Sequence, residues 1–466
     1  MKYLSTRGRA PELGFGDALM TGLAPDGGLY LPRAWPTLTA EEMAALSGLP
    51  YAQAARRIIA PFIGGEIDDD ALGAMLDDAY RDFRHPATAP LVQIDDNLWL
   101  LELFHGPTLA FKDFALQLLG RLFDHVLGKR GARVTVIGAT SGDTGSAAIH
   151  ACMDRPNIDI FILHPEGRVS EVQRRQMTTV TASNVHNIAI RGTFDDCQAL
   201  VKMMFNDIAF RRDMNLSTVN SINWARVMAQ IVYYVTAAVS LGAPSRAVTF
   251  AVPTGNFGDV YAGYAASRMG LPVRRLIVAT NRNDILARAL TTGHYKVAGV
   301  SPTISPSMDI QVASNFERLL FDLYEGDGAA VTESMTALTA EGGFDIAPEP
   351  LARARALFGA TRVDEDATLA EIARVHTETG LLIDPHTAVG VAAARAVAHD
   401  PAAPTIALAT AHAAKFPDAV ERATGRRPAA PAPLAGLLEA EERCQALDSD
   451  IAAVQNYIRS KGQPNA

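Results

Sequence analysis

Short apolar runs that recur between helical patterns place the strongest constraint on the fold of this chain. From about residue 95 onward, runs of strand length stand at Val134–Ile137, Ile158–Leu163, Val248–Val252, Leu276–Ala279 and Ile406–Ala409. Between several of them, apolar residues are spaced three and four apart, as at Phe114, Leu118, Leu119, Leu122 and Val126. Strands that are apolar on both faces must be covered on both sides. The pattern therefore predicts an α/β fold in which a parallel sheet lies between layers of helices.

Three of these runs end in turns that are rich in small residues. The turns are Gly138–Gly145, Pro253–Gly258 and Thr410–Ala414. In an open α/β sheet the ligand binds beyond the carboxyl ends of the strands. We therefore expect the three turns to converge on one site at one edge of the sheet.

The first turn, Gly138–Gly145, opens a helix and suits an anion, because it presents backbone N–H groups and the positive end of a helix dipole. Ser141 and Thr144 add hydroxyl donors. A dinucleotide fold requires Gly where this loop has Thr144, and a P-loop requires a Gly-Lys-Ser/Thr sequence that does not follow. The turn thus favours a cradle for a carboxylate or phosphate, with a nicotinamide site as the weaker alternative.

Lys112 stands at the head of an otherwise apolar helix, within the segment His105–Ala115. Such a lysine either extends past the apolar stripe to solvent, or is desolvated with a lowered pKa and able to form a Schiff base. Pyridoxal phosphate requires a lysine of the second kind, a phosphate cup and a partner for its ring nitrogen. The turn Gly255–Gly258 is a candidate cup, and Thr410 is a candidate hydroxyl for the nitrogen.

Composition excludes several other classes of function. The 466 residues include 51 acidic against 42 Lys and Arg, giving a net charge of −9, so nucleic acid and anionic membranes are not expected as partners. The three cysteines form no Cys-x-x-Cys pair, and the N-terminus has no apolar signal segment; both features predict a cytoplasmic protein. Without a His-Glu-x-x-His motif or clustered carboxylates, we expect no catalytic metal.

The chain divides into three predicted units. Residues 1–95 form a mainly helical unit, residues 96–425 form the α/β region with two subdomains, and residues 426–466 hold a Pro/Ala linker and a C-terminal helix. That helix is expected from about Glu439 to Lys461. The uncharged stretch Val227–Ser245 contains polar residues, Gly and Pro, so it predicts a buried helix ending near Gly242 and not a membrane span.

Eight segments resemble, in order, the motifs of threonine synthases. They are Tyr3–Gly8, Gly22–Tyr30, His105–Ala115, Ala139–Ala148, Asn220–Arg226, Gly255–Asp259, Asp384–Gly390 and Thr410–Phe416. The resemblance covers nearly the whole chain and is to the long bacterial and fungal branch. Ala413 departs from it, since the family commonly has Pro there, but the change removes no chemical group. The resemblance implies fold type II of the pyridoxal-phosphate enzymes (tryptophan-synthase-β-like), with open twisted sheets covered by helices and a mainly helical N-terminal domain.

The same resemblance implies the conversion of O-phospho-L-homoserine and water to L-threonine and phosphate, by γ-elimination and β-addition of water. Lys112 would hold pyridoxal 5′-phosphate and shuttle protons. The implied cofactor ligands are Asp143 near the 3′ oxygen, Gly255, Asn256, Phe257 and Gly258 at the phosphate, and Thr410 at the ring nitrogen. The implied substrate ligands are Ser141, Gly142 and Thr144 for the carboxylate and Asn220, Asn223 and Arg226 for the phosphate. Lys415 is either a further phosphate ligand or part of a structural ion pair.

Two other functions remain open at this stage. The first is a related dehydratase or β-replacing enzyme of the same fold type, although those relatives lack the Asn220–Arg226 stretch. The second is a non-catalytic homologue that binds phosphorylated metabolites, against which the intact Lys112, the Gly255–Gly258 turn and Thr410 argue. The resemblance also favours a monomer, or at most a homodimer.

Overall fold

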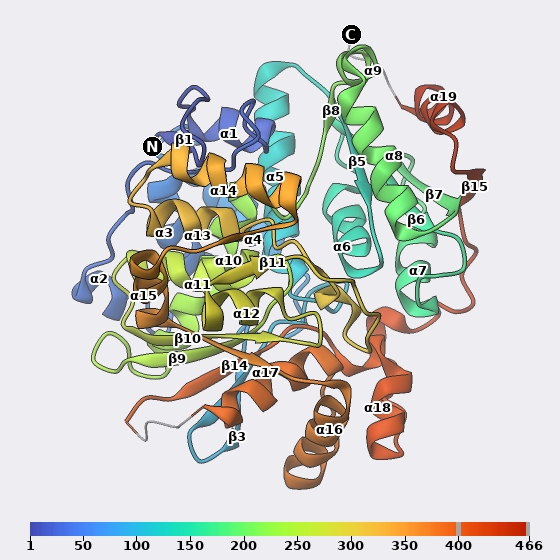
Figure 1. The fold of residues 1–466 in the computed structure, drawn as a ribbon. Helices are drawn as coiled ribbons and strands as arrows, with labels where there is room; N and C mark the ends of the chain where they lie inside the picture. Colours follow the sequence, from blue (N-terminus) through green and yellow to red (C-terminus); the bar gives the residue numbers. More distant parts are fainter. Residues whose placement is uncertain (398–401, 463–466) are drawn as a thin grey trace.

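The computed structural model describes residues 1–397 and 402–462, and Figure 1 shows their arrangement. The N-terminal part is mainly helical. It comprises β1 (Tyr3–Ser5), α1 (Phe15–Thr21), β2 (Tyr30–Pro32), α2 (Ala40–Ala44), α3 (Tyr51–Ile63) and α4 (Asp69–Tyr80). The short strands β1 and β2 pair antiparallel. The Glu66 carboxylate accepts hydrogen bonds from the amides of Phe15 (2.7 Å) and Gly16 (2.9 Å), and so fixes the start of α1 to the end of α3.

Six strands form the larger sheet, in the order β13-β10-β9-β14-β4-β3. Their bounds are β3 (Leu91–Asp95), β4 (Leu98–Glu102), β9 (Val248–Pro253), β10 (Val273–Thr280), β13 (Phe358–Arg362) and β14 (Thr405–Ala409). All neighbours are parallel except β3 and β4. In the centre, Ile406 of β14 is in register with Phe250 of β9, and both side chains are buried.

Five parallel strands form a second sheet, in the order β15-β7-β6-β5-β8. They are β5 (Val134–Ala139), β6 (Ile158–Pro165), β7 (Val185–Arg191), β8 (Leu216–Ser217) and β15 (Gln445–Asp448). Every residue of β6 is buried. The nearby helices are α6 (Asp143–Cys152), α7 (Glu171–Thr178), α8 (Phe194–Asn206), α9 (Ile208–Asp213) and α19 (Ile451–Lys461), seen with this sheet on the right of Figure 1.

The α/β class and all five predicted strands are confirmed. The strands are divided between two sheets, in keeping with the open twisted sheets that the family resemblance implies, and not gathered in the one parallel sheet that the apolar runs alone suggest. The runs that become β5 and β6 lie in the five-stranded sheet, whereas β9, β10 and β14 lie in the six-stranded one. The reason is physical: a run that is apolar on both faces shows that a strand is buried, but carries no mark of which strand lies beside it. The chain crosses between the sheets through long helices, and those crossings are decided by packing.

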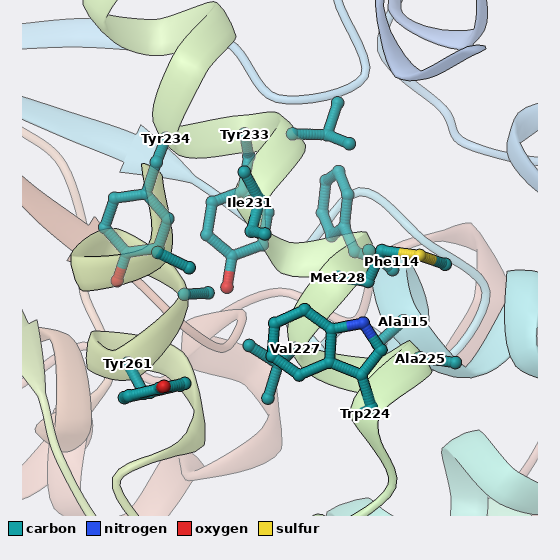
Figure 2. Packing of buried hydrophobic residues seen from close by; sticks show 14 of the residues in the cluster. Phe114, Ala115, Trp224, Ala225, Val227, Met228, Ile231, Tyr233, Tyr234 and Tyr261 are labelled. Carbon is teal, nitrogen blue, oxygen red and sulfur yellow. The ribbon is translucent and has the colours of Figure 1, made fainter. Parts of the chain in front are cut away.

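Three helices contribute many residues to the largest hydrophobic core. They are α5 (Lys112–Arg130), α10 (Trp224–Ser240) and α11 (Gly258–Arg268). Figure 2 shows Trp224, Tyr233 and Tyr234 of α10 packed near Phe114 of α5, and the rings of Phe114 and Tyr233 meet edge to face at 5.5 Å. The predicted buried helix is confirmed as α10. Among the described residues, no helix is both long and apolar enough to cross a membrane.

The remaining elements cover the six-stranded sheet and link it to the site. They are α12 (Ile285–Thr292), β11 (His294–Lys296), η1 (Pro306–Met308), α13 (Phe316–Leu323), α14 (Gly328–Glu341), β12 (Gly343–Asp345), α15 (Pro348–Leu357), α16 (Glu365–Thr379), α17 (Pro385–Ala396), η2 (Ala413–Lys415), α18 (Pro417–Thr424) and η3 (Ala432–Leu434). Helix α17 packs closely on β14 and β9. Glycine at position 390 permits this approach, because an added Cβ there would lie 3.0 Å from Cγ of Pro253 in β9.

The predicted C-terminal helix is confirmed only in its second half. Residues Gln445–Asp448 are strand β15, which extends the sheet beside β7 with Leu447 in register with Ile190. Helix α19 begins at Ile451, after the Asp450 carboxylate accepts a hydrogen bond from the Ala453 amide at 2.7 Å. Residues 445–448 become a strand because the edge of β7 offers unpaired backbone groups to them. The local sequence pattern carries no information about that edge. The division of the chain at residues 95 and 425 stays a prediction.

Candidate active site

The segment before Lys112 is tied to the end of strand β14. Ala110 and Ala411 form an isolated antiparallel bridge, the Phe111 amide donates to the Thr410 carbonyl (2.8 Å), and the His412 amide donates to the Leu109 carbonyl (3.0 Å). Because Lys112 is the first residue of α5, this pairing sets it next to Thr410, 298 positions later in the sequence. The third turn and the lysine therefore meet, as the sequence predicts.

Asp113 fixes the same segment from within. Its carboxylate accepts hydrogen bonds from the Thr108 amide (2.8 Å) and the Thr108 hydroxyl (2.7 Å). Leu109 between them has a φ of 64°, a left-handed conformation that a leucine adopts only under such restraint. Burial raises the pKa of Asp113 to about 6 against these hydrogen bonds. Asp113 was absent from the sequence prediction, although it directly follows the lysine.

The Lys112 side chain is buried, with only 9% of the residue exposed. Its Nζ atom lies 3.5 Å from Oδ2 of Asp143. Burial lowers the pKa of Lys112, the Asp143 carboxylate opposes that change, and the positive charges of Lys415 and Arg226 add to it. The first of the two readings of Lys112, a lysine extended into solvent, is wrong.

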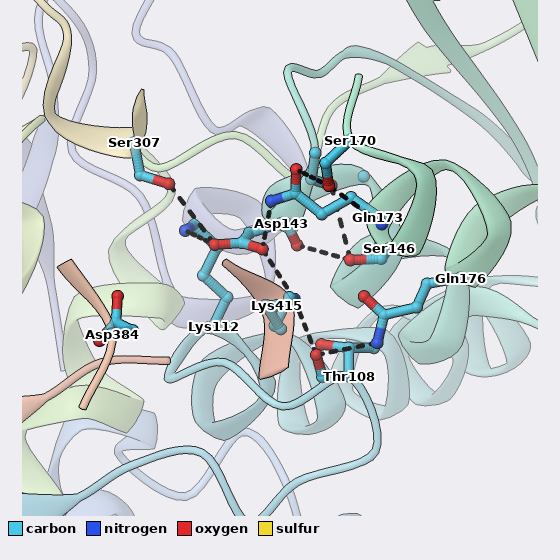
Figure 3. Close-up of polar contacts among 12 residues, drawn as sticks. Thr108, Lys112, Asp143, Ser146, Ser170, Gln173, Gln176, Ser307, Asp384 and Lys415 are labelled. Atoms are coloured by element: carbon cyan, nitrogen blue, oxygen red, sulfur yellow. Dashed lines mark hydrogen bonds and ion pairs between the residues drawn. The ribbon is translucent and has the colours of Figure 1, made fainter. Parts of the chain in front are cut away.

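Asp143 is the centre of the polar contacts drawn in Figure 3. Its Oδ1 accepts from Lys415 Nζ (2.7 Å) and Gln173 Nε2 (2.8 Å), and its Oδ2 accepts from the Ser307 hydroxyl (3.4 Å). Burial works to raise the pKa of Asp143, but the two lysines and the hydrogen bonds lower it well below its usual range. Asp143 is therefore a carboxylate throughout the physiological pH range.

The Gly255–Gly258 turn presents open donors at the start of α11. Phe257 has a φ of 64°, which turns the chain sharply before the helix. Within the described residues, the amides of Gly255, Asn256, Phe257 and Gly258 have no hydrogen-bond acceptor. A side chain at position 255 would have its Cβ only 2.7 Å from the Ser307 carbonyl oxygen, so glycine is needed for the close approach of that loop. Four free amides at a helix N-terminus suit a phosphate group.

Thr410 lies buried at the carboxyl end of β14. Its amide donates to the Thr387 hydroxyl (3.2 Å), which in turn donates to the buried Asp384 carboxylate. Asp384 also binds Nδ1 of His386 (2.7 Å), whose Nε2 accepts from the Ser307 amide (3.2 Å). Across the part of the chain that the structure describes, no hydrogen bond uses the Thr410 hydroxyl, which leaves it available for a ring nitrogen.

The first turn offers fewer donors than its sequence suggests. The Thr140 hydroxyl accepts from the amides of Gly142 (3.0 Å) and Gly145 (2.9 Å). The amides of Ser141, Asp143 and Thr144 have no acceptor in the described parts of the chain. Ser141 is exposed and Thr144 is half-buried.

Arg226 is the buried cation that the sequence predicts near the substrate. One guanidinium nitrogen donates to the Val219 carbonyl (3.2 Å), while its Nε is buried with no hydrogen-bond partner. Residues 1–397 and 402–462 supply no carboxylate within ion-pair distance of it. Burial lowers the pKa of Arg226 to about 10, and the side chain stays charged at neutral pH. A buried guanidinium without a counterion suits an anionic ligand.

The two neighbouring asparagines are placed differently from Arg226. Asn223 caps helix α10 with its carbonyl oxygen at the Ala225 amide (3.1 Å) and donates its own amide to the Leu19 carbonyl (2.8 Å). Asn220 is exposed and lines a cavity of about 310 Å³ between the N-terminal segment and helices α13 and α14. Their roles at a substrate phosphate, like that of Lys415, stay predictions.

Gln173 and Ser307 reach the site without any signal in the sequence. Both bind Asp143, yet they come from α7 and from the loop at η1, in segments with no recognisable motif. Asp259 does carry a signal, since it directly follows the Gly255–Gly258 turn. Its Oδ1 accepts from the hydroxyls of Tyr233 (2.5 Å) and Tyr234 (2.9 Å).

The residues present fit pyridoxal phosphate. Lys112 supplies a buried amine of lowered pKa, the Gly255–Gly258 turn supplies four free amides, and Thr410 supplies a free hydroxyl. The three groups come from different elements, α5, α11 and β14, and they converge through the contacts described above.

Comparison with known proteins agrees along the whole chain. Three sequence models match: "Threonine synthase N terminus" at residues 2–80, "Pyridoxal-phosphate dependent enzyme" at 83–342 and "Threonine synthase, C-terminal" at 387–458. A threonine synthase from Pseudomonas aeruginosa is 56% identical over 463 residues, covering 99% of each chain. The crystal structure of a pyridoxal-phosphate-bound threonine synthase from Brucella melitensis is also 56% identical, with a TM-score of 0.98 over 99% of this chain and 100% of that one. Yeast threonine synthase gives 39% identity and a TM-score of 0.95, covering 99% of this chain and 98% of that chain.

The fold, the site and these matches together define a pyridoxal-phosphate-dependent enzyme of fold type II, and its cofactor is pyridoxal 5′-phosphate. Within that class, the chain belongs to the threonine synthase family.

Proposed function

We propose that this chain converts O-phospho-L-homoserine and water to L-threonine and phosphate, the last step of threonine biosynthesis, with Lys112 as the acid–base group. The observation that carries the proposal is the position of the Lys112 amine, buried 3.5 Å from Asp143 and beside Thr410. A general base works best with a pKa near the operating pH, and burial moves a lysine in that direction.

The cofactor supplies an electron sink for the carbon atoms of the bound substrate. The protein moves the protons: Lys112 Nζ takes one proton from the substrate Cα and one from Cβ, and phosphate leaves from Cγ. One proton then goes to Cγ, which becomes the methyl carbon, and one returns to Cα. Water adds its hydroxyl at Cβ, and its remaining proton goes to the released phosphate. The Thr410 hydroxyl is a neutral partner for the ring nitrogen and does not protonate it as an aspartate would.

The binding roles follow from the free donors. The free amides of Gly255, Asn256, Phe257 and Gly258 would hold the cofactor phosphate, and Asp143 would be the residue beside the 3′ oxygen. The substrate carboxylate is bound by the turn that contains Ser141, Gly142 and Thr144. Because Thr140 already occupies the Gly142 amide, the donors are the amides of its neighbours and the two hydroxyls.

The substrate phosphate is assigned to Arg226, with Asn220 and Asn223 as its neighbours. The orphaned Nε of Arg226 supports the first assignment, since binding a phosphate would satisfy it. We further propose that the chain acts in the cytoplasm as a monomer, or at most a homodimer, on this small molecule, with no nucleic-acid or membrane partner.

Phosphate release from O-phosphohomoserine tests the reaction, with free homoserine as the control substrate. Lys112→Ala should lower the rate by about a thousandfold or more, because it removes the only group assigned to move both protons. Borohydride should attach the cofactor irreversibly to the Lys112 peptide of the unaltered protein. A Lys112→Ala protein that still made threonine at a tenth of the normal rate would end the proposal.

Arg226→Ala separates this function from its two alternatives. It should abolish phosphohomoserine turnover and leave slow dehydration of serine or threonine unchanged, since only the first substrate carries a phosphate. Equal loss with both substrates would favour a dehydratase. An unaltered protein that binds phosphohomoserine without releasing phosphate would be the non-catalytic homologue.

A further inference from the structure

Lys415 is a second lysine in the site, and its surroundings differ from those of Lys112. None of Lys415 is exposed. Its Nζ donates to Asp143 Oδ1 at 2.7 Å and to the Thr108 carbonyl at 2.8 Å, as Figure 3 shows. Two of its donors are thus committed to the protein at short distances, and an ammonium held in this way is fixed in place.

Asp143 therefore lies between the side-chain nitrogens of two lysines, and its contacts with them are unequal. Its Oδ1 binds Lys415 at 2.7 Å, whereas its Oδ2 is 3.5 Å from Lys112. Lys415 and Asp143 form a charge-neutral pair without any contribution from Lys112. If Lys415 were absent, the buried Asp143 carboxylate would favour the protonated form of Lys112, the nearest remaining amine. Because Lys415 already serves as the counterion of Asp143, Lys112 is not needed in that role.

We propose that Lys415 is a positioning residue, whose short ion pair with Asp143 allows Lys112 to be a neutral amine. The inference rests on the proposed role of Lys112 as the acid–base group, and it assigns Lys415 to Asp143 and not to the substrate phosphate. Lys415 itself touches no reacting atom in this assignment.

The surrounding charges agree in direction. Burial lowers the pKa of Lys112, Asp143 raises it, and Lys415 and Arg226 each lower it further. Other titratable groups within electrostatic reach of the two lysines are Asp113 of α5, His150 of α6 and Asp259 of α11. None of these three groups lies between Lys415 and Asp143, because those two side chains are in direct contact.

Lys415→Met is a suitable test because it leaves no polar group without a partner. The Thr108 carbonyl keeps the Gln176 amide at 3.1 Å, and Asp143 Oδ1 keeps the Gln173 amide at 2.8 Å. The reactivity of Lys112 towards trace acetic anhydride, followed by mass spectrometry from pH 6 to 11 in the full-length chain before cofactor is added, gives its titration midpoint. Lys415→Met should raise that midpoint by about one to two pH units, because a nearby positive charge is lost.

Asp143→Asn is the opposing variant. It removes the charge that favours protonated Lys112, so the midpoint should fall below that of the unaltered protein. The double variant Asp143→Asn with Lys415→Met removes one charge of each sign and should return the midpoint to between the two single values. A merely structural role for Lys415 would not produce shifts of opposite sign. Lys129→Met serves as the matched control, since Lys129 is exposed near the other end of α5, about 25 Å along the helix, and should move nothing.

The holoenzyme gives a second readout. The acidic limb of kcat against pH should move to higher pH in Lys415→Met, in step with the labelling midpoint. The proposal is overturned if the folded Lys415→Met chain leaves the Lys112 midpoint unchanged or lowers it. If Lys415→Met does not fold, the double variant Asp143→Asn with Lys415→Met takes its place. A Lys112 midpoint in the double variant that is no higher than in Asp143→Asn alone also overturns the proposal. Because labelling needs no turnover, its result is independent of whether the proposed reaction is correct.

Discussion

Asp143 and Asp259 occupy almost the same place in two different sheets. Each follows a parallel strand, β5 or β9, and a glycine-containing turn, and each lies in the first turn of the next helix, α6 or α11. Both are buried. Their partners differ: Asp143 contacts the Nζ atoms of Lys112 and Lys415, whereas Asp259 accepts from the hydroxyls of Tyr233 and Tyr234.

The pKa values of the two aspartates differ accordingly. Burial acts to raise the pKa of both, and the helix N-terminus favours the anion in both. Lys415 and Lys112, with the hydrogen bonds, overcome the burial of Asp143 and lower its pKa, while two neutral hydroxyls do not overcome that of Asp259, whose pKa rises to about 6. The strand–turn–helix unit thus positions a carboxylate, and side chains from distant segments set its pKa.

The largest expected difference between the two sites is in stability. Asp143→Asn leaves the buried Lys415 without its counterion and should lower the free energy of unfolding at pH 7 by about 4 kcal/mol. Because the pKa of Asp143 is depressed, its contribution is complete above about pH 4 and is lost only as the pH falls through the lowered pKa. The difference between the two proteins should therefore narrow by about 1 kcal/mol at pH 3 and should not close there. Urea unfolding at pH 7 and pH 3 measures both values. A loss of under 1 kcal/mol at pH 7 would show that the lysines do not depend on Asp143.

Asp259→Asn should have an effect of opposite sign with pH. Because the pKa of Asp259 is raised to about 6, its contribution is fully present below about pH 4 and is lost as the pH rises through 6. Between pH 4 and 7 the variant should therefore gain up to about 3 kcal/mol relative to the unaltered protein. The measurement is urea unfolding across that range.

Asp366→Asn is the control for this pH dependence, since Asp366 is exposed in the first turn of α16. It should give parallel curves. If the stability difference between Asp259→Asn and the unaltered protein does not vary with pH, the pKa of Asp259 is not raised.

The smallest expected effects concern the glycines of the two turns. Gly142 has a φ of 152° and its added Cβ would lie 2.4 Å from the Gln173 side chain, so Gly142→Ala should cost about 2 kcal/mol and disturb the Gln173 contact with Asp143. Gly258 begins a helix, and its added Cβ would meet only the Asn315 amide nitrogen at 3.3 Å, so Gly258→Ala should cost less than about 1 kcal/mol. Thermal unfolding compares the two, and equal costs would mean that the turns are equally tight.

Much of this arrangement is already present in local sequence. The five apolar runs are confirmed as strands, because both-face burial leaves a continuous apolar pattern. The turns at Gly138–Gly145 and Gly255–Gly258 were found from their glycines, and Lys112 from its unusual place on an apolar helix. All of these are short-range features, because each depends only on residues that are close together in the sequence.

What escaped prediction depends on contacts between segments. The distribution of strands over two sheets, and the edge strand β15 in place of a helix, are matters of strand pairing. Gln173 and Ser307 reach Asp143 from segments with ordinary composition. The occupied amide of Gly142 could not be foreseen either, because it depends on the rotamer of Thr140 in the folded turn.

The sequence by itself determined the α/β class, the glycine-containing turns and the place of Lys112 at the head of an apolar helix, because each depends on the spacing of neighbouring residues. Only the tertiary structure decided that Asp143 is charged, that Asp259 has a raised pKa, and that Lys415 is bound to Asp143 and Thr108. The physical reason is that electrostatic free energy depends on burial and on distances of a few ångströms between groups. Folding alone sets those distances for residues that lie far apart in the chain.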